Sequence, residues 1–425
     1  MEEVSEASRL RLSSARRRID TFIEQIDVLA ASSFPHQDGE NALAAIRTHC
    51  KELQSDLDLP PGVRDDVVNQ LCLTLLDKVD NFSAILGFIL RSTNVRNPFE
   101  LHHAVKGLIV RTLGEKPQGE DVSLLISSEW SYVPFTYPMN VDQLPGSILI
   151  GTPAPESGNP LLIPLAGHEI GHSAWRVYAF RPLFTRAVGD EVELEFSQNA
   201  RARQKLQDAD PLGALGQVRL VDQCTEHVME QLEEVFCDLF GLYLFGSAFV
   251  AAFDYLLGPG GHHRSLGYPS DRQRMAILVE AAAELDIELD PAMIADWSMA
   301  SPGKADAAAT EIVDAVTQRL VPRVRSDLFG ELRRRGMTSP DRTVIGKVRE
   351  AFERGEPYPD RAELGEIVSA GWLRMRDLDV APCRGDTDEE QHRERVKSYK
   401  VLADLVLKTV EIAEYHDRIG GHAER

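Results

Sequence analysis

The sequence predicts an α+β protein that is predominantly helical, and three observations support this class. Apolar residues recur every three or four positions before residue 120, which is the period of an amphipathic helix. Between residues 122 and 150, short apolar runs alternate with turn-forming residues, as in the strands of a small sheet. Helical periodicity returns near Pro164 and continues into the C-terminal region. Helices, a small sheet and further helices together make an α+β arrangement.

The individual elements follow from these periodicities. Pro60, Pro61 and Gly62 interrupt the N-terminal helices, because proline and glycine favour turns. The N-terminal segments with helical period are residues 19–29, 67–76 and 85–90. The runs expected to form strands are residues 122–126, 132–137 and 147–150. The later helical segments are residues 221–244, 272–285, 308–332, 342–352 and 396–415.

The charge and the motifs of the chain argue against several classes of function. A formal net charge of −21 disfavours nucleic-acid binding, because a phosphate backbone would be repelled. Arginines cluster near the start, but apolar residues recur among them as on an amphipathic helix, which favours a solvated helix face over a contact with an acidic partner. The clustered arginines are Arg9, Arg11, Arg16, Arg17 and Arg18. No G-x-S-x-G, Walker A, G-x-G-x-x-G or EF-hand pattern occurs in the chain.

Several features predict a cytoplasmic protein without a membrane span. The five cysteines are scattered, odd in number and form no C-x-x-C pair, so neither a disulfide framework nor a zinc ribbon is indicated. The start at Met1-Glu2-Glu3 leads to the arginines without an apolar segment, which predicts no secretory signal. Residues 239–257 are apolar, but Asp254 and the pair Gly246-Ser247 interrupt them, which favours a buried core helix over a membrane segment.

The segment at residues 165–175 contains the pattern H-E-x-x-H, with His168, Glu169 and His172. On an α-helix, residues four apart project from the same face, so both imidazoles can reach one metal ion. The carboxylate of Glu169 lies beside them and can hydrogen-bond a metal-bound water. The pattern therefore predicts a zinc site with Glu169 as the catalytic base.

A third ligand is expected from a second helix, because a tetrahedral catalytic site needs three protein ligands and one open position. Glu234 and Asp238 are four apart in an apolar segment, so one carboxylate can bind zinc while the other accepts the outer N–H of a ligating histidine. Glu233 is the weaker choice, because Cys237 four residues later offers no comparable acceptor. The predicted zinc ligands are therefore His168, His172 and Glu234.

These motifs resemble those of the gluzincin metallopeptidases, especially the branch that contains the CaaX prenyl proteases and HtpX-type peptidases. The E-x-x-x-D-x-x-G pattern of that branch is matched by Glu234, Asp238 and Gly241. Its H-P-x-x-x-x-R element is similar to a later segment of this chain, with Pro269 and Arg274 in register. The resemblance implies a zinc-dependent hydrolase that cleaves peptide bonds.

The resemblance covers roughly residues 120–285 and implies a zincin-like core, with a small sheet and an active-site helix, in a catalytic domain at residues 121–290. Residues 1–120 and 291–425 are then an N-terminal and a C-terminal helical region. This division suits a chain of 425 residues, which exceeds the usual size of a single core. The membrane-spanning helices of that branch have no counterpart here, so membrane substrates are not implied.

Tyr268 stands where that branch usually carries histidine. Its hydroxyl can still donate a hydrogen bond to a developing oxyanion, and His263, with His262 beside it, is the alternative donor. Arg274 is equally expected to form a structural ion pair or to bind substrate. His227 is expected either to support the metal ligands from behind or to have no role beyond ordinary packing or exposure. The histidines without ligand-like spacing are expected to be exposed: His36, His49, His102, His103, His392, His416 and His422.

Together these residues predict a zinc metallopeptidase acting on peptide or protein substrates. Zinc would lower the pKa of its bound water, and Glu169 would take the proton during attack on a carbonyl and deliver it to the leaving amine. The alternative, from a different class, is a catalytically silent zinc-binding sensor or scaffold module in a larger assembly. The helical regions at both ends are candidate surfaces for a regulatory protein partner or for homo-oligomerisation.

Overall fold

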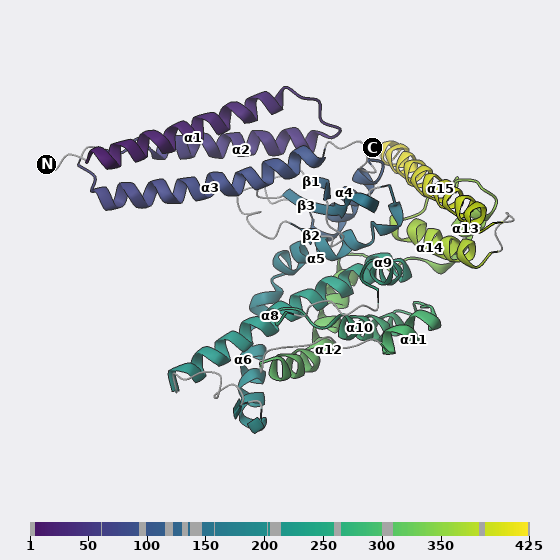
Figure 1. Cartoon of the computed structure of the whole chain (residues 1–425). Helices are drawn as coiled ribbons and strands as arrows, with labels where there is room; N and C mark the ends of the chain where they lie inside the picture. The colour runs from purple at the N-terminus through teal and green to yellow at the C-terminus, as the bar shows by residue number, and fades with distance from the viewer. Residues whose placement is uncertain are drawn as a thin grey trace. The chain divides into compact units, whose positions relative to one another are not determined.

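The structure is a computed structural model of the chain, and it is mostly helical with one small sheet (Figure 1). The predicted α+β, predominantly helical class is thereby confirmed. The residues that the structure describes are 5–60, 62–92, 99–114, 122–129, 135–136, 147–156, 158–201, 203–204, 214–258, 265–299, 309–381 and 387–423.

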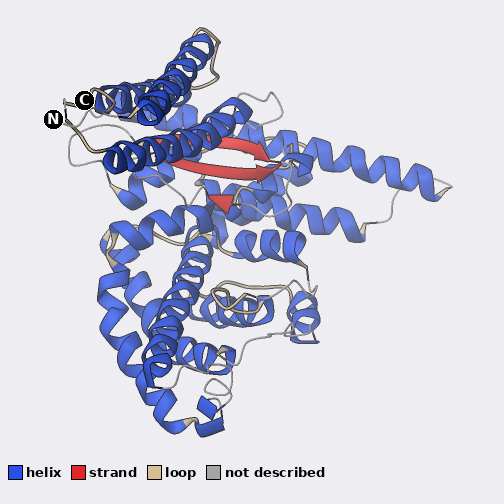
Figure 2. Cartoon of the chain, turned by 60° about the vertical axis from the view of Figure 1, so that its left-hand side comes forward, coloured by secondary structure: helices blue, strands red, loops and turns tan. Residues whose placement is uncertain are grey.

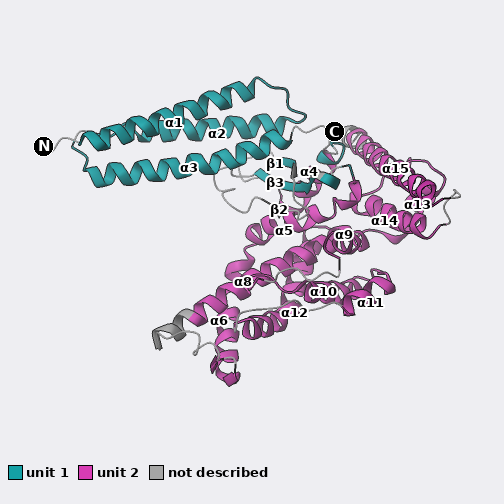
Figure 3. Ribbon diagram, in the orientation of Figure 1, with its two compact units in different colours: residues 1–102, 115–158 teal, residues 103–114, 159–425 magenta. Residues whose placement is uncertain are grey.

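The chain forms two compact units, coloured separately in Figure 3. Unit 1 comprises residues 1–102 and 115–158, and unit 2 comprises residues 103–114 and 159–425. The sheet therefore groups with the N-terminal helices, and the H-E-x-x-H segment groups with the C-terminal ones. The boundaries near residues 120 and 290 stay a prediction about folding units along the sequence.

Unit 1 is built on three long helices, α1 (Glu6–Ala30), α2 (Gln37–Asp56) and α3 (Asp65–Ser92). Each buries one apolar face; on α1 this face carries Ala15, Ile19 and Ile26, spaced four and seven apart. On its outer side, Arg16 and Arg18 form exposed ion pairs with Asp58 and Asp80. The arginine cluster thus lies on a helix face that is largely open to solvent, as predicted.

The sheet of unit 1 contains β1 (Ser123–Glu129), β2 (Phe135–Thr136) and β3 (Ser147–Pro153) in the order β1-β3-β2 (Figure 2). β1 and β3 pair in parallel, with Ser123 opposite Ser147, and β2 pairs antiparallel with β3. Leu125 and Leu149 join the core of the three helices. The predicted strands at 122–126 and 147–150 are confirmed, and within 132–137 only Phe135–Thr136 lies among the described residues.

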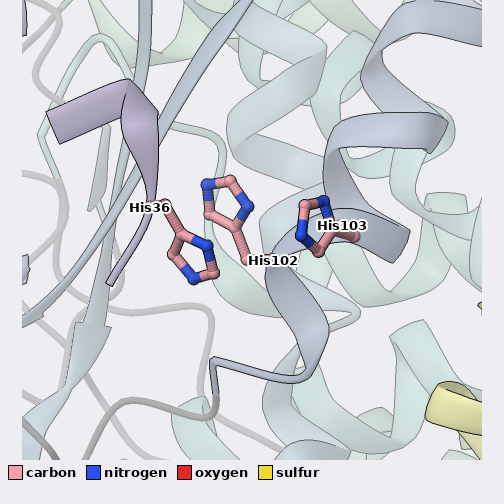
Figure 4. A group of neighbouring side chains, drawn as sticks. All are labelled: His36, His102 and His103. Atoms are coloured by element: carbon pink, nitrogen blue, oxygen red, sulfur yellow. The ribbon is translucent and has the colours of Figure 1, made fainter. Parts of the chain in front are cut away.

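The rings of His36 and His102 stack face to face in unit 1, with centroids 3.7 Å apart and planes 8° from parallel (Figure 4). His102 Nε2 donates a hydrogen bond to Leu124 O at 3.0 Å, and Asp38 Oδ2 accepts one from Leu124 N at the same distance. Both residues thereby fasten β1 to the helices. The prediction that His102 is exposed is wrong, because only 4% of its surface is accessible. The adjoining cavity measures about 20 Å³, enough for one water molecule.

Unit 2 is almost entirely helical. Its first helix, α4 (Leu101–Leu113), begins with the last two residues of the first segment of unit 1, residues 1–102. After the short 3-10 turn η3 (Pro160–Leu162), the described helices are α5 (Leu165–Val177), α6 (Phe180–Gln198), α8 (Ala214–Phe245), α9 (Ser247–Leu257), α10 (Asp271–Glu284), α11 (Pro291–Met299), α12 (Thr310–Arg334), α13 (Arg342–Glu353), α14 (Leu364–Val380) and α15 (Asp388–Ala423). Together they give unit 2 its own buried core.

The apolar stretch at 239–257 is largely buried as far as Phe253, whereas Tyr255 is 44% exposed, and the stretch is divided between α8 and α9. Gly246, with a φ of +57°, makes the break, as the pair Gly246-Ser247 predicted. Asp254 accepts a hydrogen bond from Trp297 Nε1 at 2.6 Å. Within the described part of the chain, no helix combines the length and the apolar content needed to cross a bilayer.

The two helices that carry the predicted zinc motifs, α5 and α8, cross at glycines. A methyl group on Gly171 would lie 2.8 Å from Cys237 Cα, and one on Gly167 would lie 3.0 Å from Gly241 Cα. These backbone contacts cannot yield without moving a whole helix. The lack of a side chain at Gly167 and at Gly171 therefore determines how closely α5 approaches α8.

We expect Gly171→Ala to lower the free energy of unfolding by about 1–3 kcal/mol, because the added methyl overpacks the crossing. Gly189→Ala is the matched control, since that glycine lies inside α6 with nothing within 4 Å of the added methyl. It should be neutral or stabilise by up to about 1 kcal/mol. Urea denaturation measures both, and equal effects would contradict the tight crossing.

Candidate metal centre

Helix α5 presents the H-E-x-x-H motif on one face. Its apolar residues Ile170, Ala174 and Trp175 are buried against the core, which fixes the rotation of the helix about its axis. His168 and His172 lie one turn apart with ring centroids separated by 5.1 Å. The two imidazoles are therefore available to a single partner group.

Helix α8 supplies that partner group. His168 Nε2 lies 3.2 Å from Glu234 Oε2, and His172 Nε2 lies 3.8 Å from Glu234 Oε1. Glu234 itself is buried in a largely apolar stretch of α8. The structure thus brings together the three side chains that the sequence selected from two separate motifs.

The outer nitrogens of both histidines are held by carboxylates of α8. His168 Nδ1 lies 2.9 Å from Asp238 Oδ1, as predicted, and His172 Nδ1 lies 2.9 Å from Glu233 Oε1. A carboxylate can only accept, so each Nδ1 carries the proton, and in a neutral ring each Nε2 offers its lone pair towards Glu234. The role of Glu233 was not predicted from the sequence. The signal was present, since two ligating histidines call for two outer acceptors.

Arg274, from α10, completes the support of His168. Its Nε and Nη2 donate to Asp238 Oδ2 and Oδ1 at 2.7 and 2.8 Å, and its guanidinium lies 5.0 Å from the centre of the Phe253 ring. Of the two roles expected for Arg274, the structure shows the ion pair. Because both partners are buried, each charge depends on the other.

The electrostatics of the centre follow from this buried network. Burial disfavours a charged imidazole, but Asp238 and Glu234 outweigh it and raise the pKa of His168 to about 10. Burial likewise disfavours the charge on Asp238, yet Arg274 and His168 outweigh it and lower the pKa of Asp238 to about 2. The same partners lower the pKa of Glu234 against the effect of burial. Without a metal, the centre therefore holds a proton on His168.

The donors present fit a divalent transition metal. Two imidazole nitrogens and one carboxylate are the ligands of many catalytic zinc sites. Glu234 Oε2 is buried and, among the described residues, makes no well-formed hydrogen bond, although His168 Nε2 lies 3.2 Å away. A buried carboxylate oxygen without a hydrogen bond is costly, and a cation would satisfy it.

Cys237 is a further sulfur donor near the histidines. One ligand atom each of His168, His172 and Cys237 lies within 4.8 Å of the other two. Burial, reinforced by Glu234 and Glu233, holds the pKa of this thiol well above its usual value. Both imidazole Nε2 atoms face Glu234, so the carboxylate is the better third ligand and Cys237 remains a protonated thiol in this arrangement.

Two more predicted residues lie at the centre. Glu169 is buried on α5, close enough to Tyr268 for its charge to act on the phenol. Tyr268 is half-exposed, and burial together with its interaction with Glu234 raises the pKa of its hydroxyl. The alternative donor, His263, lies outside the described residues. His227 pairs with Glu230 at 2.8 Å on α8.

Comparison of this chain with protein-family models, with curated proteins and with solved structures finds no match. The resemblance to the gluzincins therefore rests on the motifs. The side-chain geometry on α5, α8 and α10 is an observation independent of that resemblance, and a proposed function has to account for it.

We expect Asp238→Asn to weaken zinc binding about 10- to 100-fold, because the amide holds His168 less firmly and adds no negative charge. Loss of the buried partner of Arg274 should also lower the unfolding free energy, by roughly 3 kcal/mol or more. Competition with a chromophoric chelator measures the affinity. Asp222→Asn, on the exposed side of the same helix, is the control and should leave it unchanged. Equal affinities for the two variants would remove Asp238 from the centre.

Proposed function

We propose that this chain is a zinc-dependent metallopeptidase with a zincin-like core, in which His168, His172 and Glu234 hold the metal. One observation carries the proposal: both Nε2 atoms face Glu234 while carboxylates hold both Nδ1 atoms. The side chains of this arrangement come from two helices, α5 and α8. It is the arrangement expected when three protein donors share a cation and leave one position open.

The chemistry divides between the metal and the side chains around it. Bound Zn²⁺ supplies Lewis-acid polarisation and makes water a stronger acid. The Glu169 carboxylate accepts a proton from the attacking water and passes it to the nitrogen of the leaving amine. The Tyr268 hydroxyl donates a hydrogen bond to the carbonyl oxygen of the substrate as it gains negative charge. A tyrosine hydroxyl is protonated at neutral pH, and the raised pKa of Tyr268 extends that protonated range to higher pH.

The partners that this proposal implies are peptide or protein substrates. The proposal also includes two predictions made from the sequence: a cytoplasmic location, and control by a regulatory protein partner or by self-association. The similarity to the gluzincins supports the reaction type.

Replacing Glu169 by glutamine tests the reaction directly. The amide cannot accept the proton, so kcat should fall at least about 100-fold while zinc content stays unchanged. Mass spectrometry of a proteome-derived peptide library, incubated with zinc-loaded protein, detects the new peptide ends. Glu193→Gln, exposed on α6, is the matched control and should cleave like wild type. Undiminished cleavage by Glu169→Gln would refute this mechanism.

Cys237 favours a second candidate function, the catalytically silent zinc module. If its thiolate joined the two histidines and Glu234, four protein ligands would close the site, as in structural zinc centres. Such a module would bind zinc firmly and leave no position for water. It would serve as a sensor or scaffold in a larger assembly.

Cobalt substitution separates the two candidates. The peptidase proposal predicts that the Co²⁺ protein shows no thiolate-to-cobalt charge-transfer band in the near ultraviolet, since Cys237 stays protonated. It also predicts that Cys237→Ala binds Co²⁺ with an unchanged visible spectrum. A charge-transfer band that disappears in Cys237→Ala would instead establish a closed centre and favour the silent module.

A further inference from the structure

Tyr268 belongs to a short segment without regular secondary structure that precedes α10. Within residues 265–270, the only described backbone hydrogen bond between residues of the segment runs from Tyr268 N to Ser265 O, at 3.4 Å. This long bond holds a turn weakly. The position of the Tyr268 phenol beside Glu234 and Glu169 therefore depends on contacts outside the segment.

Gln231 makes the principal contact. It lies on α8, three residues before Glu234, with only 1% of its surface exposed. Its Nε2 donates to Leu266 O at 2.9 Å and lies 3.4 Å from Tyr268 O. One amide group thus contacts the backbone carbonyls of the residues on both sides of Gly267.

The same amide is held by α12. Gln231 Nε2 lies 3.3 Å from Asp314 Oδ1, and the other oxygen, Asp314 Oδ2, accepts from Gln273 Nε2 at 3.4 Å. The side-chain oxygen of Gln273 accepts from Ser270 N at 3.0 Å in the capping box of α10. The network therefore ties both the middle and the end of the Tyr268 segment to helices.

Close packing of the segment on α8 supports the same role. A methyl group on Gly267 would lie 2.5 Å from Glu230 Oε2, one residue from Gln231. The segment therefore packs against the Glu230 side chain of α8. A methyl group at this position would require the Glu230 carboxylate to move.

We propose that Gln231 is a positioning residue: by holding the Leu266 and Tyr268 carbonyls on α8, it keeps the Tyr268 hydroxyl facing the substrate carbonyl. The described hydrogen bonds of Gln231 run to Leu266, Tyr268 and Asp314 and not to the three predicted ligands, so its proposed route to the reaction is through Tyr268. This inference rests on the proposed peptidase function for its catalytic part. Its structural part, the fixing of residues 265–270, is independent of catalysis.

The structural part is tested on metal-free protein by hydrogen exchange. Gln231→Met keeps the length of the side chain and removes its donor, so the amides of Leu266, Gly267, Tyr268 and Ser270 should exchange about tenfold faster. Those of α8 should be unchanged. Gln223→Met, exposed on the same helix, is the matched control and should behave like wild type. If Gln231→Met does not fold, Gln231→Ala takes its place. Unchanged exchange in residues 266–270 would overturn the inference.

The catalytic part is tested by a double-mutant cycle on the zinc-loaded protein. Tyr268→Phe should lower kcat about 100-fold and Gln231→Met about tenfold, with KM nearly unchanged in both. In the Tyr268→Phe background, Gln231→Met should have no further effect, because its route to the reaction is gone. If the effects of the two substitutions on kcat multiplied in the double variant, the inference about Gln231 would be overturned, whereas the proposed peptidase function would stand. An inactive wild type would overturn the proposed function and the catalytic part with it, whereas hydrogen exchange would still decide the structural part.

Discussion

The close crossing of α5 and α8 is the constraint on which the candidate metal centre depends. Gly171 lies against Cys237, and Gly167 against Gly241 and Phe245, at distances that exclude any side chain. Histidine and glutamate side chains have fixed reach, so their contacts persist only while the helix axes stay this close. A small outward movement of α5 would separate His168 and His172 from Glu234 together. The glycines of the motif region are therefore as important to the centre as its ligands.

Burial of charge is the second constraint, and the network satisfies it by pairing. Asp238 is 1% exposed and receives both the Arg274 guanidinium and the His168 ring. Removing one partner would leave the others as buried, unpaired charges, which is far more costly than losing a surface ion pair. The carboxylates near the histidines outnumber the cations of Arg274 and protonated His168. A divalent cation that displaces the His168 proton would reduce this excess. The carboxylates are Glu169, Glu233, Glu234 and Asp238.

Sequence reasoning predicted those parts of the structure that depend on local spacing. The four-residue spacing of His168 and His172, and of Glu234 and Asp238, reports directly which side chains share a helix face. The break at Gly246 was equally local. Helix α6 was missed although its buried residues Phe184, Val188 and Val192 recur every four positions, so that signal was available.

Other features depend on contacts that no local pattern encodes. The parallel pairing of β1 with β3 joins segments 24 residues apart, and nothing within either strand specifies its neighbour. The role of Glu233 depends on how α5 is turned towards α8, because its carboxylate must reach the far nitrogen of His172. Gln231 acquires a role only because residues 265–270 fold back onto α8. Such long-range placements require the tertiary structure.

Helix α8 holds the Tyr268 segment, faces the imidazoles and supports His168 because the three residues that do so follow the three- and four-residue spacing of one helix face. Gln231, Glu234 and Asp238 are separated by three and four residues, so they lie on successive turns of a single rigid element. The first holds the segment that carries Tyr268, the second faces both imidazoles, and the third fixes His168 and Arg274. Since a helix scarcely changes length or twist, the mutual distances of these three anchors are set by the backbone. The backbone of α8 therefore orients the phenol, the ligands and their support relative to one another before any substrate arrives.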